Sequence, residues 1–326
     1  MLIIGCSGST GSSLLKTILN RHSQIFAGPE TGLFGFPQLY GNWEYHKYKM
    51  LKGLYTNGWA LRDRVELLSD EFGWTEGKLL QAIRSSNRFP EFVDRFFSLP
   101  LERYSKCYWV EKTPINAYGF SAFLKNHPNG KAVQIVRSPY DTVASLVARG
   151  INVYWAAGYY VYNTAIATSS NPSPRYHQLA YEELAARPIP VLKKLFDFME
   201  MPFEPHICTP SQKEKSEEVK MKGWKHSETG DIKKSSIGRF GELPGKEQAL
   251  IKSALASFQI NKGYLKKYGI RYKNCRELCE ALGYPFLPPE KKHALVLIKY
   301  YCKDRLARIK HHRPQQFFDY PGKLKL

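Results

Sequence analysis

The sequence lacks several features that would place it in a common class of protein. No apolar run approaches the roughly eighteen residues that a membrane-spanning helix needs. The six cysteines include no Cys-x2-Cys pair, and although Cys275 and Cys279 lie one helical turn apart, no histidine completes a zinc set. No secretory signal precedes the first expected strand, which begins at residue 2. We therefore expect free thiols, no bound metal and a cytoplasmic location.

Acidic residues are scarce relative to basic ones: 29 Asp and Glu stand against 48 Lys and Arg, and the formal net charge is +19. Such a charge suits either nucleic acid or a small molecule that carries several negative charges. The basic residues are spread along the chain rather than concentrated in an arm, and no nucleic-acid-binding module is recognisable. The composition therefore favours a small anionic ligand and argues against nucleic acid as a partner.

The loop after the first expected strand has the composition of an anion-binding turn, yet it lacks a cation. The apolar residues 2–6 lead into the small residues 8–11, and a helix is expected to begin at Ser12. Backbone N–H groups at such a helix start point toward an anion, and the helix dipole favours negative charge there. The loop holds no Lys or Arg, and its glycine spacing also departs from the nucleoside-triphosphate loop Gly-x4-Gly-Lys-Ser/Thr. It predicts a phosphate or sulfate site, with a tight turn without ligand as the open alternative.

Four segments have the character of buried strands, at residues 2–6, 25–28, 108–112 and 132–138. Each leads into a helical or mixed stretch, and this alternation predicts an α/β fold with a parallel sheet flanked by helices, similar to that of P-loop proteins. In such sheets, ligands bind beyond the carboxyl ends of the strands. The residues that follow each expected strand are therefore the first candidates for a site.

The remaining segments are interpreted from composition. Residues 33–105 contain little strand signal and are expected to be a helical insertion. Residues 152–166 predict an aromatic helix, for which core packing is favoured over a pocket wall, and residues 207–236 predict a long loop. Residues 271–326 are expected to be a basic, helical C-terminal extension, in which residues 294–310 have amphipathic character. That amphipathic segment could contact an anionic membrane surface, although docking onto its own domain is favoured.

Polar side chains follow the expected strands at positions that suit chemistry. Glu30 comes directly after the second strand in a rigid Gly-Pro-Glu turn, where a general base could be placed. Lys112 ends the third strand, and the nearby Pro114 favours extended backbone at the preceding residue. Arg137 ends the fourth strand, and Ser145 lies on the helix that follows. Because an arginine fork matches phosphate geometry, Arg137 and Ser145 predict a second anion site.

The order of these motifs resembles that of the sulfotransferases that use 3′-phosphoadenylyl sulfate (PAPS). The motifs that carry the resemblance lie at residues 5–15, 28–31, 111–114, 136–145, 179–184, 195–203 and 235–239. Their joint order is more specific than any single one, and the bacterial and tyrosylprotein-type branch is the most similar. The resemblance spans residues 1–270 as the sulfotransferase domain. It implies that residues 33–105 lie on the acceptor side and that residues 271–326 are an extension.

The resemblance also implies a role for each matching residue. Glu30 corresponds to the catalytic base, and Lys112 to the cation that stabilises the leaving oxygen. The cofactor-binding residues that it implies are Gly8, Ser9, Thr10, Gly11, Ser12 and Ser13 for the 5′-phosphosulfate, Arg137 and Ser145 for the 3′-phosphate, and Tyr181, Ser236 and Arg239 for the rest of the nucleotide. The implied reaction transfers a sulfuryl group in line to a hydroxyl of a sugar, a phenol or tyrosine, or a lipid headgroup, without a metal.

Two positions depart from the family pattern, Ser9 and, more mildly, Ser138, where many relatives carry the first Asp of the 3′-phosphate motif. Most members carry Arg or Lys where this chain has Ser9, and that side chain touches the transferred sulfate. Lys112 could act alone, or Lys16, four residues after Ser12 on the same helix face, could replace the charge. The chain could instead bind PAPS or its product and transfer poorly. A P-loop kinase is a further alternative, disfavoured by the absence of the loop lysine.

Overall fold

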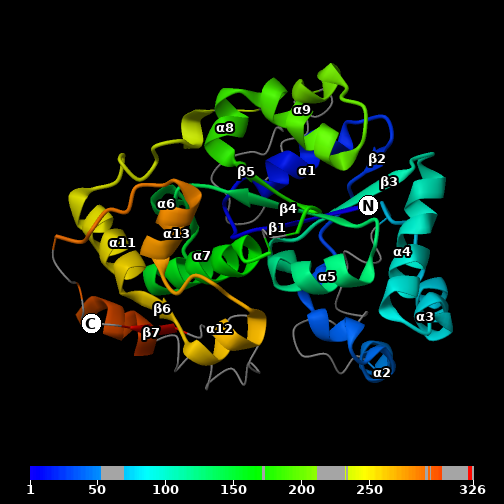
Figure 1. The fold of residues 1–326 in the computed structure, drawn as a ribbon, viewed down its shortest axis with the longest axis horizontal. Helices are drawn as coiled ribbons and strands as arrows, with labels where there is room; N and C mark the ends of the chain where they lie inside the picture. The colour runs from blue at the N-terminus through cyan, green and yellow to red at the C-terminus, as the bar shows by residue number, and fades with distance from the viewer. Residues whose placement is uncertain are drawn as a thin grey trace.

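The computed structural model describes residues 1–52, 70–170, 173–210, 232, 234–290, 293, 295–302 and 322–324. A five-stranded, fully parallel sheet forms the centre, with strand order β2-β3-β1-β4-β5 (Figure 1). Its strands are β1 (Leu2–Gly5), β2 (Ile25–Phe26), β3 (Tyr108–Lys112), β4 (Lys131–Val136) and β5 (Tyr176–Ala180). The predicted α/β fold is thus confirmed, and so are the four predicted strands, although three of them are shorter at their carboxyl ends than expected. The fifth strand, β5, was not predicted.

The sheet is covered on both faces because its strands alternate their side chains between two cores. In β1, Leu2 and Ile4 belong to one buried cluster and Ile3 to the other. On the Leu2 face lie α1 (Ser12–Asn20), α8 (Tyr181–Ala186) and α9 (Pro188–Met199), seen above the sheet in Figure 1. On the opposite face lie α5 (Phe120–Asn126), α6 (Pro139–Ala148) and α7 (Val153–Thr168). This three-layer arrangement leaves the carboxyl ends of the strands open to a ligand.

The described part of the predicted insertion, residues 33–52 and 70–105, is helical as expected. It contains η1 (Leu33–Gly35), η2 (Pro37–Tyr40), α2 (Trp43–Lys52), α3 (Glu76–Ser85) and α4 (Phe89–Arg103). An aromatic cluster ties it to the sheet: Trp109 of β3 stacks on Phe97 with ring centroids 4.1 Å apart and on Phe34 at 5.7 Å. Residues 53–69 lie outside the described part of the chain. The insertion therefore packs beside β2 and β3, next to the turn that carries Glu30.

Helix α7 is the predicted aromatic helix, and it is buried on every side except at Trp155. It begins at Asn152, whose side chain accepts a hydrogen bond from the Trp155 N–H at 2.7 Å. Core packing is therefore its main role. One of its residues also approaches the loop of residues 8–11, because a Cβ atom on Gly8 would lie 3.0 Å from the ring of Tyr159.

The C-terminal part adds helices on the α6–α7 side. Its elements are η6 (Lys234–Ser236), α11 (Gly245–Ser257), β6 (Phe258–Ile260), α12 (Lys262–Tyr268), α13 (Cys275–Leu282) and β7 (Gly322–Leu324), which pairs with β6. Earlier in the chain, η4 (Pro114–Gly119) lies between β3 and α5, and η5 (Pro205–Cys208) follows α9. Of the amphipathic segment 294–310, residues 295–302 are helical, with Leu297 buried in the core and Leu295 83% exposed. Residues 303–310, and residues 211–231 and 233 of the predicted long loop, lie outside the described part.

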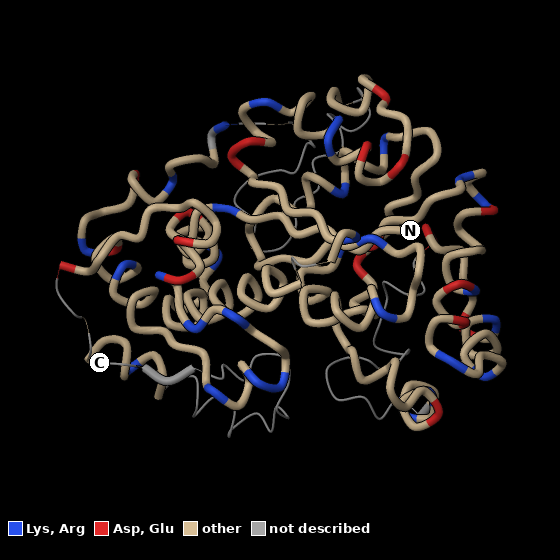
Figure 2. The backbone as a smooth tube through the Cα atoms, viewed as in Figure 1, with Lys and Arg blue, Asp and Glu red and all other residues tan. Residues whose placement is uncertain are grey.

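Two compositional expectations can be compared with the structure. The six cysteines are free, and Cys275 and Cys279 place their sulfur atoms 3.8 Å apart on α13. No helix within the described ranges is long and apolar enough to cross a membrane. Figure 2 shows Lys and Arg distributed over all layers of the fold.

Candidate active site

The loop between β1 and α1 has a backbone conformation that few other residue types would tolerate. Gly11 precedes α1 with a φ of 95°, and a Cβ atom there would lie 2.4 Å from the ring of Tyr181. Ser9 also has a positive φ, of 66°. Thr10 Oγ1 donates to the Ser7 carbonyl at 2.9 Å and holds the turn closed. Within the described residues no side chain caps α1, so the N–H groups of its first turn face the open edge of the sheet.

Glu30 and Lys112 meet on one side of this loop. Lys112 ends β3 with its side chain only 4% exposed, and its Nζ forms an ion pair with Glu30 Oε1. The Glu30 side chain remains 46% exposed, so its carboxylate is accessible to solvent. Lys112 Nζ also donates to Ser13 Oγ at 3.2 Å. Three motifs that are far apart in the sequence thus converge on the start of α1.

Arg137 lies on the other side of the loop. Its Nη1 donates to the Ser9 carbonyl at 2.9 Å, its Nη2 donates to the Ser236 carbonyl, and its guanidinium lies 5.1 Å from the Tyr181 ring centroid. Burial lowers the pKa of Arg137, and Asp141, 3.9 Å away, counteracts that effect. Among the described residues, Arg137 Nε is buried without a hydrogen-bond partner. A buried cation with a spare donor is an unusual arrangement that an anion would satisfy.

The segment around Arg239 folds back onto α6 beside Arg137. Asp141 accepts hydrogen bonds from the N–H groups of Gly238 and Phe240, each at 2.8 Å. This anchor brings Arg239 Nη1 within 3.3 Å of Ser145 Oγ. Two guanidinium groups and a hydroxyl therefore share one corner of the site.

Arg149 is a residue that the sequence interpretation missed. It follows α6 directly, and its Nη1 donates to Ser9 Oγ at 2.9 Å. A cation thus reaches the position at which the loop itself lacks one. The signal was present in the spacing, since Arg149 lies four residues after Ser145 and hence on the same face of that helix. Lys16, the other candidate for this charge, is half-buried on α1 and engaged within the structure.

All the residues proposed from the sequence therefore gather at the carboxyl edge of the sheet. They form two groups, Glu30 with Lys112 and Arg137 with its neighbours, joined by the loop of residues 8–13. Ser7 Oγ, directly before this loop, is also buried without a hydrogen-bond partner among the described residues. In the described ranges, no three His, Cys, Asp or Glu side chains are placed to hold a metal ion. What the site offers is backbone N–H groups, hydroxyls, cations and one accessible carboxylate.

A parallel α/β sheet with cations gathered at its carboxyl edge is compatible with several classes of enzyme, and a family comparison is more specific. Residues 2–205 match the model of the sulfotransferase family. The chain therefore belongs to this family. A search of curated proteins found no match.

Several solved structures that are similar to the chain are described as sulfotransferases or sulfotransferase domains. The sulfotransferase domain from the curacin biosynthetic pathway has 19% identity and a TM-score of 0.49, covering 88% of this chain and 98% of that one. The sulfotransferase domain from the olefin synthase of Synechococcus has 19% identity and a TM-score of 0.49, covering 88% and 95%. The sulfotransferase STF9 from Mycobacterium avium has 15% identity and a TM-score of 0.38, covering 63% and 65%.

Proposed function

We propose that this sulfotransferase transfers the sulfuryl group of PAPS to a hydroxyl group of an acceptor. The observation that carries the proposal is the convergence of Lys112, Arg137 and Arg149 on one loop that begins a helix. PAPS carries a 5′-phosphosulfate and a 3′-phosphate, so it needs two anion sites a nucleoside apart. The chain offers two such groups of donors on either side of Ser9.

The donor-binding roles follow from the chemistry of the two groups. The N–H groups at the start of α1, with the hydroxyls of Ser12 and Ser13, would hold the 5′-phosphosulfate. Arg137, through its spare Nε, would hold the 3′-phosphate together with Ser145 and Arg239. Gly11 allows the Tyr181 ring to pack against the loop, beside Ser236, where the rest of the nucleotide would lie. Arg149 would supply the positive charge that Ser9 does not carry.

Glu30 and Lys112 would perform the proton and charge transfers. Glu30 Oε accepts the proton of the acceptor hydroxyl as the new oxygen–sulfur bond forms. The bond between sulfur and the bridging oxygen of the donor breaks, and adenosine 3′,5′-bisphosphate leaves. Lys112 Nζ, between Glu30 and Ser13, stabilises the charge that develops on that leaving oxygen. The ion pair holds the Glu30 carboxylate beside Lys112 before the acceptor binds.

The acceptor would enter from the side of residues 33–105. These residues pack next to the Glu30 turn, and their described part is rich in aromatic side chains. A sugar, a phenol or tyrosine, or a lipid headgroup would each suit such a surface. We retain residues 1–270 as the proposed catalytic domain and residues 271–326 as its extension.

Transfer of labelled sulfate from PAPS to a panel of acceptors tests this proposal. We expect Lys112→Ala to lower turnover about a hundredfold and Glu30→Gln to lower it by a similar factor. Lys131→Ala is a matched control, because Lys131 pairs with Glu200 at 2.9 Å at the other edge of the sheet and should leave turnover unchanged. Wild-type rates in both active-site variants would contradict the mechanism.

The same assay separates the alternatives. Affinity for adenosine 3′,5′-bisphosphate without transfer to any acceptor would identify a binding protein of the same fold. ATP binding that adenosine 3′,5′-bisphosphate does not compete would favour a kinase.

A further inference from the structure

Two consecutive residues at the end of β3 contact two consecutive residues of the turn after β2. Lys112 pairs with Glu30, and the preceding residue, Glu111, binds Thr31. Because side chains alternate along a strand, the two contacts lie on opposite faces of the sheet. One contact borders the open edge, whereas the other lies in the protein interior, where Glu111 is only 1% exposed.

The buried contact is far more extensive than the accessible one. Glu111 Oε1 accepts from the Thr31 N–H at 2.8 Å, from Thr31 Oγ1 at 2.9 Å and from Thr113 Oγ1 at 2.6 Å. Its Oε2 accepts from Asn116 Nδ2. The two threonine hydroxyls accept in turn from backbone N–H groups of the same turn: Thr113 Oγ1 from Gly32 at 3.0 Å, and Thr31 Oγ1 from Leu33 at 3.2 Å. One carboxylate thus fixes three successive residues after Glu30.

We propose that Glu111 is a positioning residue that holds Glu30 at Lys112 by fixing Thr31. This inference rests on the proposed role of Glu30 as the base and deepens it. The Glu30 side chain is half exposed, so its own surroundings restrain it little. The backbone of the neighbouring Thr31 is tied to β3 through Glu111, and β3 also carries Lys112. The base and the cation therefore share one rigid support, which keeps their separation constant when an acceptor binds.

The chemistry of the contact requires a carboxylate. All four groups around Glu111 are donors, so both oxygens must accept. Burial raises the pKa of Glu111 above its ordinary value, and the hydrogen bonds from Thr113, Asn116 and Thr31 offset only part of that rise. Glutamine at this position would direct an N–H group against another donor. If Glu111 served only stability, an apolar side chain could replace it. Its hydrogen bonds instead suit a residue that fixes the position of the turn after Glu30.

The test compares Thr31→Val, Thr31→Ser and Glu111→Gln. We expect Thr31→Val and Glu111→Gln to lower kcat between about tenfold and a hundredfold, since small displacements of a reacting group have effects of that size. The Kd for adenosine 3′,5′-bisphosphate should stay within about twofold of wild type, because the anion sites do not involve Thr31. Thr31→Ser keeps the hydroxyl and should restore kcat. Titration with adenosine 3′,5′-bisphosphate counts the folded sites, so that loss of folded protein is not mistaken for loss of kcat.

A double-mutant cycle with Glu30→Gln shows whether the effect passes through Glu30. We expect Thr31→Val to cause no further loss of kcat in the Glu30→Gln background. Additive losses, or wild-type kcat per folded site in both Thr31→Val and Glu111→Gln, would overturn the positioning role. Wild-type kcat in Glu30→Gln alone would instead overturn the proposed function of Glu30, so the two failures are distinguishable.

Discussion

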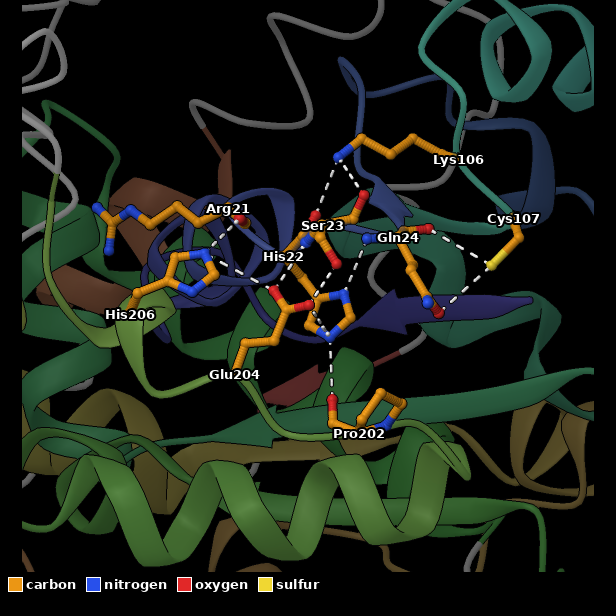
Figure 3. Close-up of polar contacts among 9 residues, drawn as sticks. All are labelled: Arg21, His22, Ser23, Gln24, Lys106, Cys107, Pro202, Glu204 and His206. Carbon is orange, nitrogen blue, oxygen red and sulfur yellow. Dashed lines mark hydrogen bonds and ion pairs between the residues drawn. The ribbon is translucent and has the colours of Figure 1, made fainter.

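The two edges of the parallel sheet use their cations differently. At the amino edge, basic side chains donate to backbone carbonyl oxygens that lie far away in the sequence. Those with such contacts are Arg21, Lys106, Lys131 and Arg175. Figure 3 shows one such group, in which Lys106 donates to the carbonyls of His22 and Ser23 at 3.0 and 2.7 Å. Next to it, Glu204 accepts from the Ser23 N–H at 2.8 Å and joins residues 202–206 to the end of α1.

At the carboxyl edge, Lys112 and Arg149 contact hydroxyls and an accessible carboxylate. Arg137 donates to two main-chain carbonyls, yet within the described part of the chain its Nε has no partner. A cation whose donors are used on the main chain stabilises the fold. A buried cation with an unused donor is costly unless an anion satisfies it. We therefore expect the cations at the amino edge to serve the fold and those at the carboxyl edge to serve ligand binding as well.

Replacing Arg137 with Met should have the largest effect on ligand binding. We expect the Kd for adenosine 3′,5′-bisphosphate to rise about a hundredfold or more, because removing one partner of a buried charge pair typically costs about 3 kcal/mol. Isothermal titration calorimetry measures this change. Arg137 also donates to the Ser9 and Ser236 carbonyls and pairs with Asp141, so the substitution should lower the free energy of unfolding as well, and the Kd is compared per folded site. Arg137→Lys, which keeps a charge but loses the fork, should bind with intermediate affinity. A Kd within about threefold of wild type in Arg137→Met would show that this corner does not hold the nucleotide.

The same substitution at the amino edge should change stability without changing binding. Arg175 Nη1 donates to the carbonyls of His127 and Gly130 at 2.7 and 3.0 Å, and its Nη2 donates to Leu124, so it holds the end of α5 against β5. We expect Arg175→Met to lower the free energy of unfolding by about 2 kcal/mol, measured by denaturant titration. The Kd of the folded protein for adenosine 3′,5′-bisphosphate should not change. If Arg175→Met instead weakened the binding of adenosine 3′,5′-bisphosphate and kept full stability, the proposed difference between the two edges would be wrong.

The sequence was sufficient to predict the residues at the strand ends. Glu30, Lys112 and Arg137 each follow or end a predicted strand, and carboxyl ends of parallel strands meet at one edge, so their convergence follows from the fold class. Strand β5 was missed because its Tyr-His-Gln-Leu-Ala sequence has no continuous apolar run, as suits an edge strand whose burial is incomplete.

The partners of individual side chains could not be predicted in the same way. Glu111 binds Thr31 across 80 positions of sequence, and nothing local to either residue indicates the other. Arg149 reaches Ser9 only because α6 ends where it does. The sequence shows that the loop holds no cation, but the approach of Arg149 to Ser9 depends on a tertiary contact, and the roles of these residues in transfer stay predictions.

The smallest expected effect concerns pH and should touch only the amino edge. His127 is buried beside Tyr40, with Nε2 and the Tyr40 hydroxyl 3.1 Å apart, and burial lowers its pKa from 6.5 to about 4. The unfolded chain therefore binds a proton as the pH falls below 6.5, while the folded protein does not until about pH 4, so stability falls through that window. We expect this histidine to account for a loss of about 1 kcal/mol between about pH 7.5 and 5.5. Denaturant titrations should show that the free energy of unfolding depends less on pH in His127→Gln than in the wild type. The Kd for adenosine 3′,5′-bisphosphate should differ from wild type by the same factor at both pH values. An unchanged pH dependence of stability would mean that His127 is not the group that titrates.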